Sequence, residues 1–359
     1  MHRPPNARFQ FAEVQLACTC IADDLAFFRG LGFELDLIFP ADSPEIAVLV
    51  GYGLRLRLER TEQASSTLLK LAVHGGEELP PACQAPGGTR IEFVSSEVVE
   101  ELPALESQLA ICRNAGEDAW GTGRAGMQYR DLIADRVGGH FIASHIRIQS
   151  GGLVPDYVHY HHVKVQIIYC LKGWVKVVYE DQGDPILLTA GDCFLQPPAI
   201  RHRVLECSAG LEVLEIGSPA RHETRADREL DLPNGRIDRK RDFSGQVFLW
   251  HRAEGAPQSA WHFDGFSARE SGLELATNGL ARLQAACPNG QPITGQHEQR
   301  DAFRFWFVRE GSIQMLVDGE PHELGAGDSI VFPRGVTIEP QQCAPETELV
   351  EFAMESDRP

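Results

Sequence analysis

Hydrophobic and polar residues alternate in two long stretches of the chain, and a different pattern precedes them. From residue 129 to about 216, and again over 243–354, short alternating runs are separated by Gly, Pro and Asp turns. Alternation with a period of two turns one face of each strand towards a core, and many short strands are typical of antiparallel barrels or sandwiches. The two stretches are similar in length and rhythm, which indicates an internal duplication.

The first hundred residues have a mixed pattern that predicts a small α/β unit. The expected strands cover 9–18, 33–38, 46–50, 54–59, 68–73 and 89–94. A short helix is expected over 22–29, because acidic residues open it and Gly30 ends it. Gly-Tyr-Gly at 51–53 is a hairpin signal. Apolar residues at helical spacing predict a further helix over 95–110.

The first five elements have the order βαβββ, and together with the text ADDLAFFRGLGFELD they resemble half of a vicinal-oxygen-chelate (glyoxalase-like) domain. A metal site of that family needs His or Glu ligands from paired modules. Here no His lies on the first expected strand, and Glu59 is the sole carboxylate at the end of the fourth. We therefore expect this module to have no intact metal site and to serve packing or dimerisation.

These patterns predict three domains, covering 1–110, 125–220 and 243–356. A Gly-rich connection separates the first two. The charged stretch 218–242, including the basic residues at 236–241, is expected to be a solvated linker between the last two. The expected fold class is mainly β, with a small α/β domain at the N-terminus.

Composition narrows the class of protein. Of the 359 residues, 43% are hydrophobic and 23% are charged, which is typical of a soluble globular protein. There is no apolar run of 18 residues and no apolar signal-peptide core, so a cytoplasmic protein without a transmembrane helix is expected. The net charge of −18 argues against a nucleic-acid partner. The nine cysteines form no CxxC pair, which favours reduced thiols.

The central stretch carries polar residues at a spacing suited to metal binding. His159 and His161 are two residues apart, so on a strand they face the same way, whereas His162 faces the other way. The pattern continues with Gln166, Gly173, Gly191, Pro197 and His202.

These two segments resemble the two conserved motifs of cupins: Gly, His-x-His, a carboxylate and Gly in the first, then Gly, Pro and His in the second. The resemblance covers about 129–217. It implies a double-stranded β-helix (jelly-roll) barrel that binds one divalent metal ion. The ligands it implies are His159, His161, Gln166 and His202.

Gln166 stands where the family usually has Glu. An amide oxygen can still coordinate a hard or borderline cation. Because three imidazoles and an amide are all neutral, the ion would keep its double positive charge and act as a strong Lewis acid. The sequence leaves zinc, iron, manganese and nickel open.

Three more residues are candidates for catalysis. Tyr157 shares the strand parity of His159 and is expected at the mouth of the barrel, while Cys170 shares that of Gln166 and is expected inside. Arg147, in the strand ASHIRIQSGG, could bind a substrate carboxylate in a bidentate way or be an exposed strand residue, and both interpretations stay open.

The C-terminal stretch repeats the pattern without most of its ligands. His297 stands at the first ligand position and Gln299 at the second, but Arg304 replaces the acidic residue and Ile338 replaces the last His. The scaffold Gly and Pro positions are kept. The chain therefore resembles a bicupin whose second barrel is degenerate and metal-free.

Three functions are compatible with these motifs, because the cupin fold hosts unrelated activities. The first is an enzyme that uses the ion as a Lewis acid on a small oxygenated metabolite, in isomerisation, ring opening, cyclisation or hydrolytic cleavage. The ligand set is similar to that of uronate-linearising enzymes and polyketide cyclases. The second is a non-haem Fe(II) dioxygenase, because bicupins of this length resemble gentisate-type dioxygenases. The third is a non-catalytic metal- or ligand-binding cupin.

The expected partner is a small molecule with carbonyl or carboxylate groups. Open strand edges of cupin barrels invite a second chain, so a homodimer is also expected.

Overall fold

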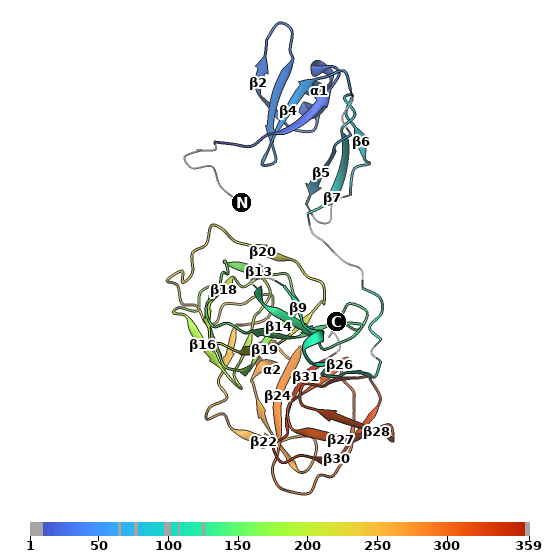
Figure 1. The fold of residues 1–359 in the computed structure, drawn as a ribbon, viewed down its shortest axis with the longest axis vertical. Helices are drawn as coiled ribbons and strands as arrows, with labels where there is room; N and C mark the ends of the chain where they lie inside the picture. Colours follow the sequence, from blue (N-terminus) through green and yellow to red (C-terminus); the bar gives the residue numbers. More distant parts are fainter. Residues whose placement is uncertain are drawn as a thin grey trace. The chain divides into compact units, whose positions relative to one another are not determined.

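The computed structural model describes residues 10–63, 66–74, 78–96, 102–106, 108–123 and 126–355. The chain forms two compact units, Met1–Glu100 and Glu101–Pro359, coloured blue to cyan and cyan to red in Figure 1. None of the described helices has the length and apolar character needed to cross a membrane.

The first unit begins with the predicted βαβββ order. Its sheet has the strand order β1-β4-β3-β2, and β1 runs parallel to β4. Its elements are β1 (Val14–Cys18), α1 (Ile21–Gly30), β2 (Glu34–Phe39), β3 (Ile46–Gly51) and β4 (Leu54–Arg60). Phe28 of α1 packs with Leu16 and Leu58 on one face of the sheet. A second, three-stranded sheet contains β5 (Leu68–Val73), β7 (Arg90–Ser95) and β6 (Cys83–Gln84).

The helix predicted over 95–110 is wrong. Residues 97–101 and 107 lie outside the described part, but 102–106 and 108–109 are irregular, and the chain then enters a strand. Pro103 explains the error, because proline lacks an N–H group and its ring clashes with the preceding helical turn. Its carbonyl oxygen instead lies 2.8 Å from Nε2 of His140.

The second unit contains two β-barrels, each made of two sheets (Figure 1). The seven-stranded sheet of the first barrel contains, in spatial order, β21 (Leu249–His251), β17 (Cys193–Leu195), β14 (Val165–Lys172), β19 (Leu211–Ser218), β11 (Ile142–Ile148), β10 (Gln128–Asp131) and β9 (Gly121–Thr122). A short 3-10 helix, Gly116–Ala119, precedes β9. The opposing sheet contains β16 (Ile186–Thr189), β15 (Trp174–Tyr179), β18 (His202–Cys207), β13 (His159–His161) and β20 (Thr224–Ala226), with β12 (Gly152–Leu153) beside β18.

The second barrel repeats this arrangement. Its seven-stranded sheet contains β22 (Gln258–Ala260), β23 (Phe266–Glu270), β24 (Ala281–Pro288), β31 (Glu348–Met354), β26 (Phe303–Glu310), β29 (Ser329–Phe332) and β8 (Ala110–Cys112). Its other sheet contains β25 (His297–Glu298), β30 (Thr337–Cys343), β27 (Ser312–Val317) and β28 (Glu320–Gly325). A one-turn helix, α2 (Leu273–Ala276), lies between β23 and β24.

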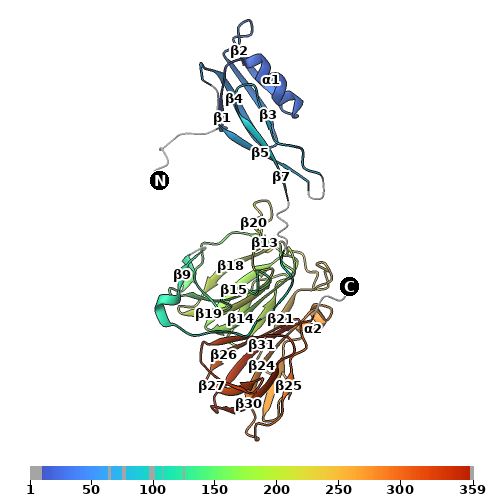
Figure 2. The same ribbon diagram turned by 90° about the vertical axis from the view of Figure 1, so that its right-hand side faces the viewer.

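The two barrels share one hydrophobic core. It joins the outer faces of their seven-stranded sheets, and the strands of the two barrels lie next to each other in Figure 2. At its centre the rings of Phe141 and Phe303 stack with centroids 3.8 Å apart. The barrels also exchange strands, because β21 pairs with β17 of the first barrel and β8 pairs with β29 of the second. Neither exchange follows from the domain boundaries expected at 110 and 243.

The stretch 218–242 is mostly exposed, as expected, but it is more than a linker between the barrels. Its strand β20 pairs with β13, and Arg201 binds Asp227. Further along, Arg241 contacts Glu180 and Asp181, at 2.7 and 2.8 Å. Ion pairs in both directions thus hold this stretch against the first barrel, and its strand β20 extends one sheet of that barrel.

Candidate metal centre

Three histidines converge inside the first barrel. His159 on β13 is directly opposite His202 on β18, and His161 lies two residues further along the same strand. Because residues two apart share a face of a strand, all three imidazoles project to one side. Their ligand atoms lie within 4.8 Å of one another. The residues that the sequence placed in one ligand set are therefore neighbours in space.

Each imidazole is oriented by a contact to its Nδ1 atom. Nδ1 of His159 and of His202 lies 2.8 and 3.1 Å from the main-chain carbonyl oxygen two residues earlier. Since a carbonyl oxygen can only accept, these Nδ1 atoms carry the proton and the lone pair is on Nε2. Nδ1 of His161 lies 2.8 Å from the hydroxyl of Thr224 on β20. Contacts of this kind fix the tautomer and direction of a metal-binding imidazole.

Gln166, on β14, brings an amide to the same cavity and is 1% exposed. Its Nε2 donates a hydrogen bond of 2.5 Å to Oε1 of Glu215 on β19. Because a carboxylate only accepts, this bond points the NH₂ end of the amide at Glu215 and turns the oxygen away from it. That oxygen is buried and has no hydrogen-bond partner among the described residues. A buried amide oxygen without a partner costs free energy, which a bound cation would recover.

The side chains present fit a divalent ion. Three imidazole nitrogens and one amide oxygen make four donors of the types that zinc, iron, manganese and nickel accept. From the sequence alone, all four ligands were expected to be neutral. The structure adds a carboxylate, because Glu215 is hydrogen-bonded directly to the Gln166 amide. Cupins usually carry a negative charge on the ligand itself. Here the carboxylate of Glu215 lies behind the ligand Gln166 and contacts the centre only through it.

The ligand cavity has a volume of about 400 Å³. His161, His202, Gln166 and Glu215 form part of its wall, and aliphatic residues of both sheets form much of the rest. Tyr157 also lines the cavity. It is 49% exposed, in agreement with its predicted position at the barrel mouth.

Cys170 does not line this cavity. It is fully buried in the barrel core, and its thiol lies 3.7 and 3.6 Å from the carbonyl oxygens of Lys172 and Gly173. Burial raises its pKa to about 12. Cys170 thus lies inside the barrel, as expected, but in its packed core, where burial disfavours the thiolate that is the reactive form of cysteine.

Arg147 also lies away from the cavity. On β11 it is Ile146 and Ile148 that face the cavity, so the alternation of the strand turns Arg147 outwards. Its guanidinium makes two hydrogen bonds to the carboxylate of Glu117, at 2.8 and 2.5 Å, and stacks 4.0 Å from the ring centre of Trp120. The substrate clamp considered for Arg147 is corrected to a structural ion pair.

Several polar residues of the site were missed at the level of sequence: Tyr179, Gln196 and His222 line the cavity, as do Glu215 and Thr224. Glu215 lies in the text LEVLEIGS, whose alternation would have placed it on the cavity face, opposite Ile168. Thr224 lies in the stretch that was expected to be a linker. No local pattern reveals that this stretch returns to pair with the His-x-His strand.

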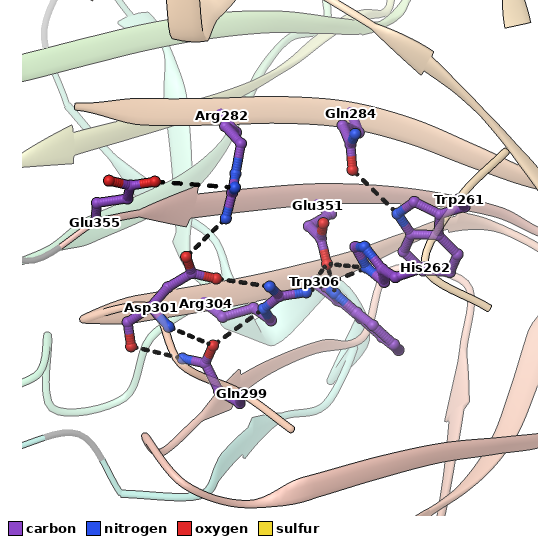
Figure 3. A network of polar contacts seen from close by, with 10 residues as sticks. All are labelled: Trp261, His262, Arg282, Gln284, Gln299, Asp301, Arg304, Trp306, Glu351 and Glu355. Atoms are coloured by element: carbon purple, nitrogen blue, oxygen red, sulfur yellow. Dashed lines mark hydrogen bonds and ion pairs between the residues drawn. The ribbon is translucent and has the colours of Figure 1, made fainter. Parts of the chain in front are cut away.

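The equivalent place in the second barrel is filled by an ion-pair network (Figure 3). His297 is opposite Ile338, just as His159 is opposite His202. Arg304 is buried there and reaches Asp301 and Glu351 at 2.6 and 2.8 Å.

Burial of Glu351 opposes its ionisation, but His262 and Arg304 lower its pKa to about 2. A guanidinium with its two carboxylates therefore stands where the first barrel has its candidate ligands.

The two barrels keep one feature of this site in common. Gln166 is the second residue of β14, and Arg304 is the second residue of β26. Gln166 pairs with Gly217, two residues after Glu215, and Arg304 pairs with Ala353, two residues after Glu351. In both barrels this Glu binds the neighbouring side chain, an amide in one and a guanidinium in the other.

Comparison with known proteins agrees with this architecture. A family model described as a cupin domain matches residues 144–216 and 285–341, one segment in each barrel. Oxalate decarboxylase from Bacillus subtilis is similar in structure, with a TM-score of 0.51 and 13% identity over 72% of this chain and 77% of that one. A single-residue mutant of salicylate 1,2-dioxygenase from Pseudoaminobacter salicylatoxidans, in complex with gentisate, has a TM-score of 0.50 and 16% identity over 70% and 83%. No curated protein matched the sequence.

The two barrels are therefore cupin domains. Their two-barrel arrangement is the fold shared with oxalate decarboxylase and with the salicylate 1,2-dioxygenase mutant.

Proposed function

We propose that the first cupin domain binds one divalent metal ion through His159, His161, His202 and Gln166, and that the protein is an enzyme for a small oxygenated metabolite. The observation that carries the proposal is the orientation of the donors. Two imidazoles present Nε2 lone pairs because main-chain carbonyls hold their Nδ1 protons, and the amide presents its oxygen because Glu215 holds its nitrogen.

The ion would supply Lewis acidity, polarising a carbonyl or enolate oxygen and lowering the pKa of a bound water. The chain's own residues do the rest. The aliphatic wall holds the body of the substrate and excludes water, which strengthens electrostatic interactions inside. Tyr157, at the mouth, can donate a hydrogen bond from its hydroxyl to an entering oxygen atom. Glu215 fixes the Gln166 amide so that its oxygen is already placed.

A non-haem Fe(II) dioxygenase is the second candidate, and the three-His centre within this fold favours it. Oxygen uptake separates the two chemistries. Full turnover with zinc, which has no redox chemistry, would exclude the dioxygenase, whereas turnover only with iron and oxygen would replace the Lewis-acid proposal. A cupin that binds a ligand without converting it would show no turnover with either metal.

The primary test is elemental analysis of the purified protein. We expect about one equivalent of metal per chain, lost in His202→Ala, because a site reduced to three donors binds far more weakly. His297→Ala in the second barrel is the matched control and should keep the full metal content. Full retention of metal by His202→Ala would remove the basis of the proposal.

A further inference from the structure

We infer that the cavity of the first barrel selects a neutral, largely apolar molecule whose oxygen atoms approach the three histidines, and that it discriminates against substrates with a carboxylate in their body. The inference rests on the proposed function only for where the oxygen atoms bind. The preference for an uncharged body follows from the cavity wall.

The wall is apolar on both of its sheets. Side chains that line it include Ile146, Ile168, Val177, Phe194 and Val213. Of these, Ile146, Val177, Phe194 and Val213 are less than a tenth exposed and belong to the barrel core. Burial of apolar surface against such a wall is favourable in proportion to its area. A hydrocarbon or aromatic body is therefore the complementary shape for this space.

The wall offers no permanently charged cation. Among the described residues that line the cavity there is neither an arginine nor a lysine, its one histidine outside the candidate ligand set is His222, and its one carboxylate is Glu215. A ligand carboxylate held away from the metal would be buried without a cation and near a like charge, which is strongly unfavourable. Arg147, on the wall strand β11, faces away from the cavity and is bound to Glu117.

Two further polar side chains that face the cavity, Gln196 and Tyr179, are an amide and a phenol. Nε2 of Gln196 donates a hydrogen bond of 2.8 Å to the hydroxyl of Tyr179, and both residues line the cavity. A phenol hydroxyl carries its proton at neutral pH. This pair can exchange hydrogen bonds with a neutral hydroxyl or carbonyl, but it supplies no countercharge for an anion.

The test uses two probes with the same metal-binding head and different bodies. Tert-butylcatechol and protocatechuate both present two adjacent hydroxyls, but the first carries an apolar group where the second carries a carboxylate. Binding to the full chain is measured by calorimetry in the zinc-loaded and the chelator-treated protein. We expect tert-butylcatechol to bind at least about tenfold more tightly in both forms, because only protocatechuate buries an unpaired charge.

Two neighbouring positions on β11 provide matched variants. Ile148 faces the cavity and is half-buried, so Ile148→Lys should strengthen protocatechuate binding relative to tert-butylcatechol. Arg147→Gln changes the outward face and should leave the ratio of the two affinities as it was. Equal affinities in the unmodified protein, or loss of protocatechuate binding in Arg147→Gln, would overturn the inference.

The outcomes also separate this inference from the proposed function. If zinc does not bind, or does not change either affinity, the proposed metal chemistry fails while the preference for the neutral probe can still hold. If zinc raises the affinity for both probes equally, and protocatechuate binds as tightly as tert-butylcatechol, the metal site stands and the inference about the substrate fails.

Discussion

The hydrogen bond between Gln166 and Glu215 leads to a specific prediction about metal affinity. Glu215→Gln removes the charge of the acceptor and gives it an NH₂ group of its own. The Gln166 amide can then flip and present nitrogen, which is no ligand, to the centre. The lost charge-assisted bond is worth about 1.5–3 kcal/mol, and loss of an orienting partner of a metal ligand typically weakens binding about 10- to 100-fold.

The assay is competition for zinc against a chromophoric chelator, with cobalt absorption spectra as a report of ligand geometry. Glu212→Gln is the matched control. It lies on the same strand β19 but faces the other way, where it accepts a hydrogen bond of 2.8 Å from Nε2 of His145. We expect zinc affinity to be unchanged in that control within about twofold, a difference of less than about 1 kcal/mol.

A double variant tests the orientation directly. In Gln166→Glu, Glu215→Gln the carboxylate moves onto the ligand position and the amide moves behind it, so zinc affinity should return at least to that of the unmodified protein. Gln166→Glu alone puts two carboxylates in contact and should destabilise the metal-free protein. If Glu215→Gln binds zinc as tightly as the unmodified chain, with an unchanged cobalt spectrum, Glu215 does not orient the amide and the reasoning is refuted.

Two further predictions concern the second barrel. The pKa of Glu351 lies near 2 in the folded protein against an ordinary 4.5, so the unfolded chain takes up this proton first and the free energy of unfolding should fall as pH drops from 4.5 towards 2. Glu351→Gln should flatten that part of the profile and cost about 3–5 kcal/mol at neutral pH, because buried Arg304 loses a partner; an unchanged profile in denaturant melts would contradict this. Phe303→Ala should cost about 3–5 kcal/mol, since the ring is fully buried against Phe141 between the barrels. Leu275→Ala, at an 89% exposed residue, is its control, and equal unfolding midpoints for the two variants would speak against a shared core.

Much of the fold and the heart of the site were accessible from sequence, because both rest on local rules. Alternation along a strand puts His159 and His161 on one face, and glycine and proline spacing marks where the strands end. The first unit's βαβββ order, the duplicated β pattern and the second barrel's Arg304 were all readable in this way. The helix expected over 95–110 failed on an equally local signal, Pro103, whose effect outweighs the apolar spacing around it.

The features that could not be predicted from the sequence depend on which strands are neighbours in the sheets. Glu215 reaches Gln166 from 49 residues away, and Thr224 reaches His161 from 63 residues away. The outward turn of Arg147, the exchange of β8 and β21 between barrels and the charge behind Gln166 are of the same kind. Side-chain direction is set by the backbone of a single strand, whereas the partner a side chain meets is set by sheet register and barrel closure, which involve the whole unit. The ligands could therefore be predicted from spacing, but their orientation and charge depend on the tertiary structure.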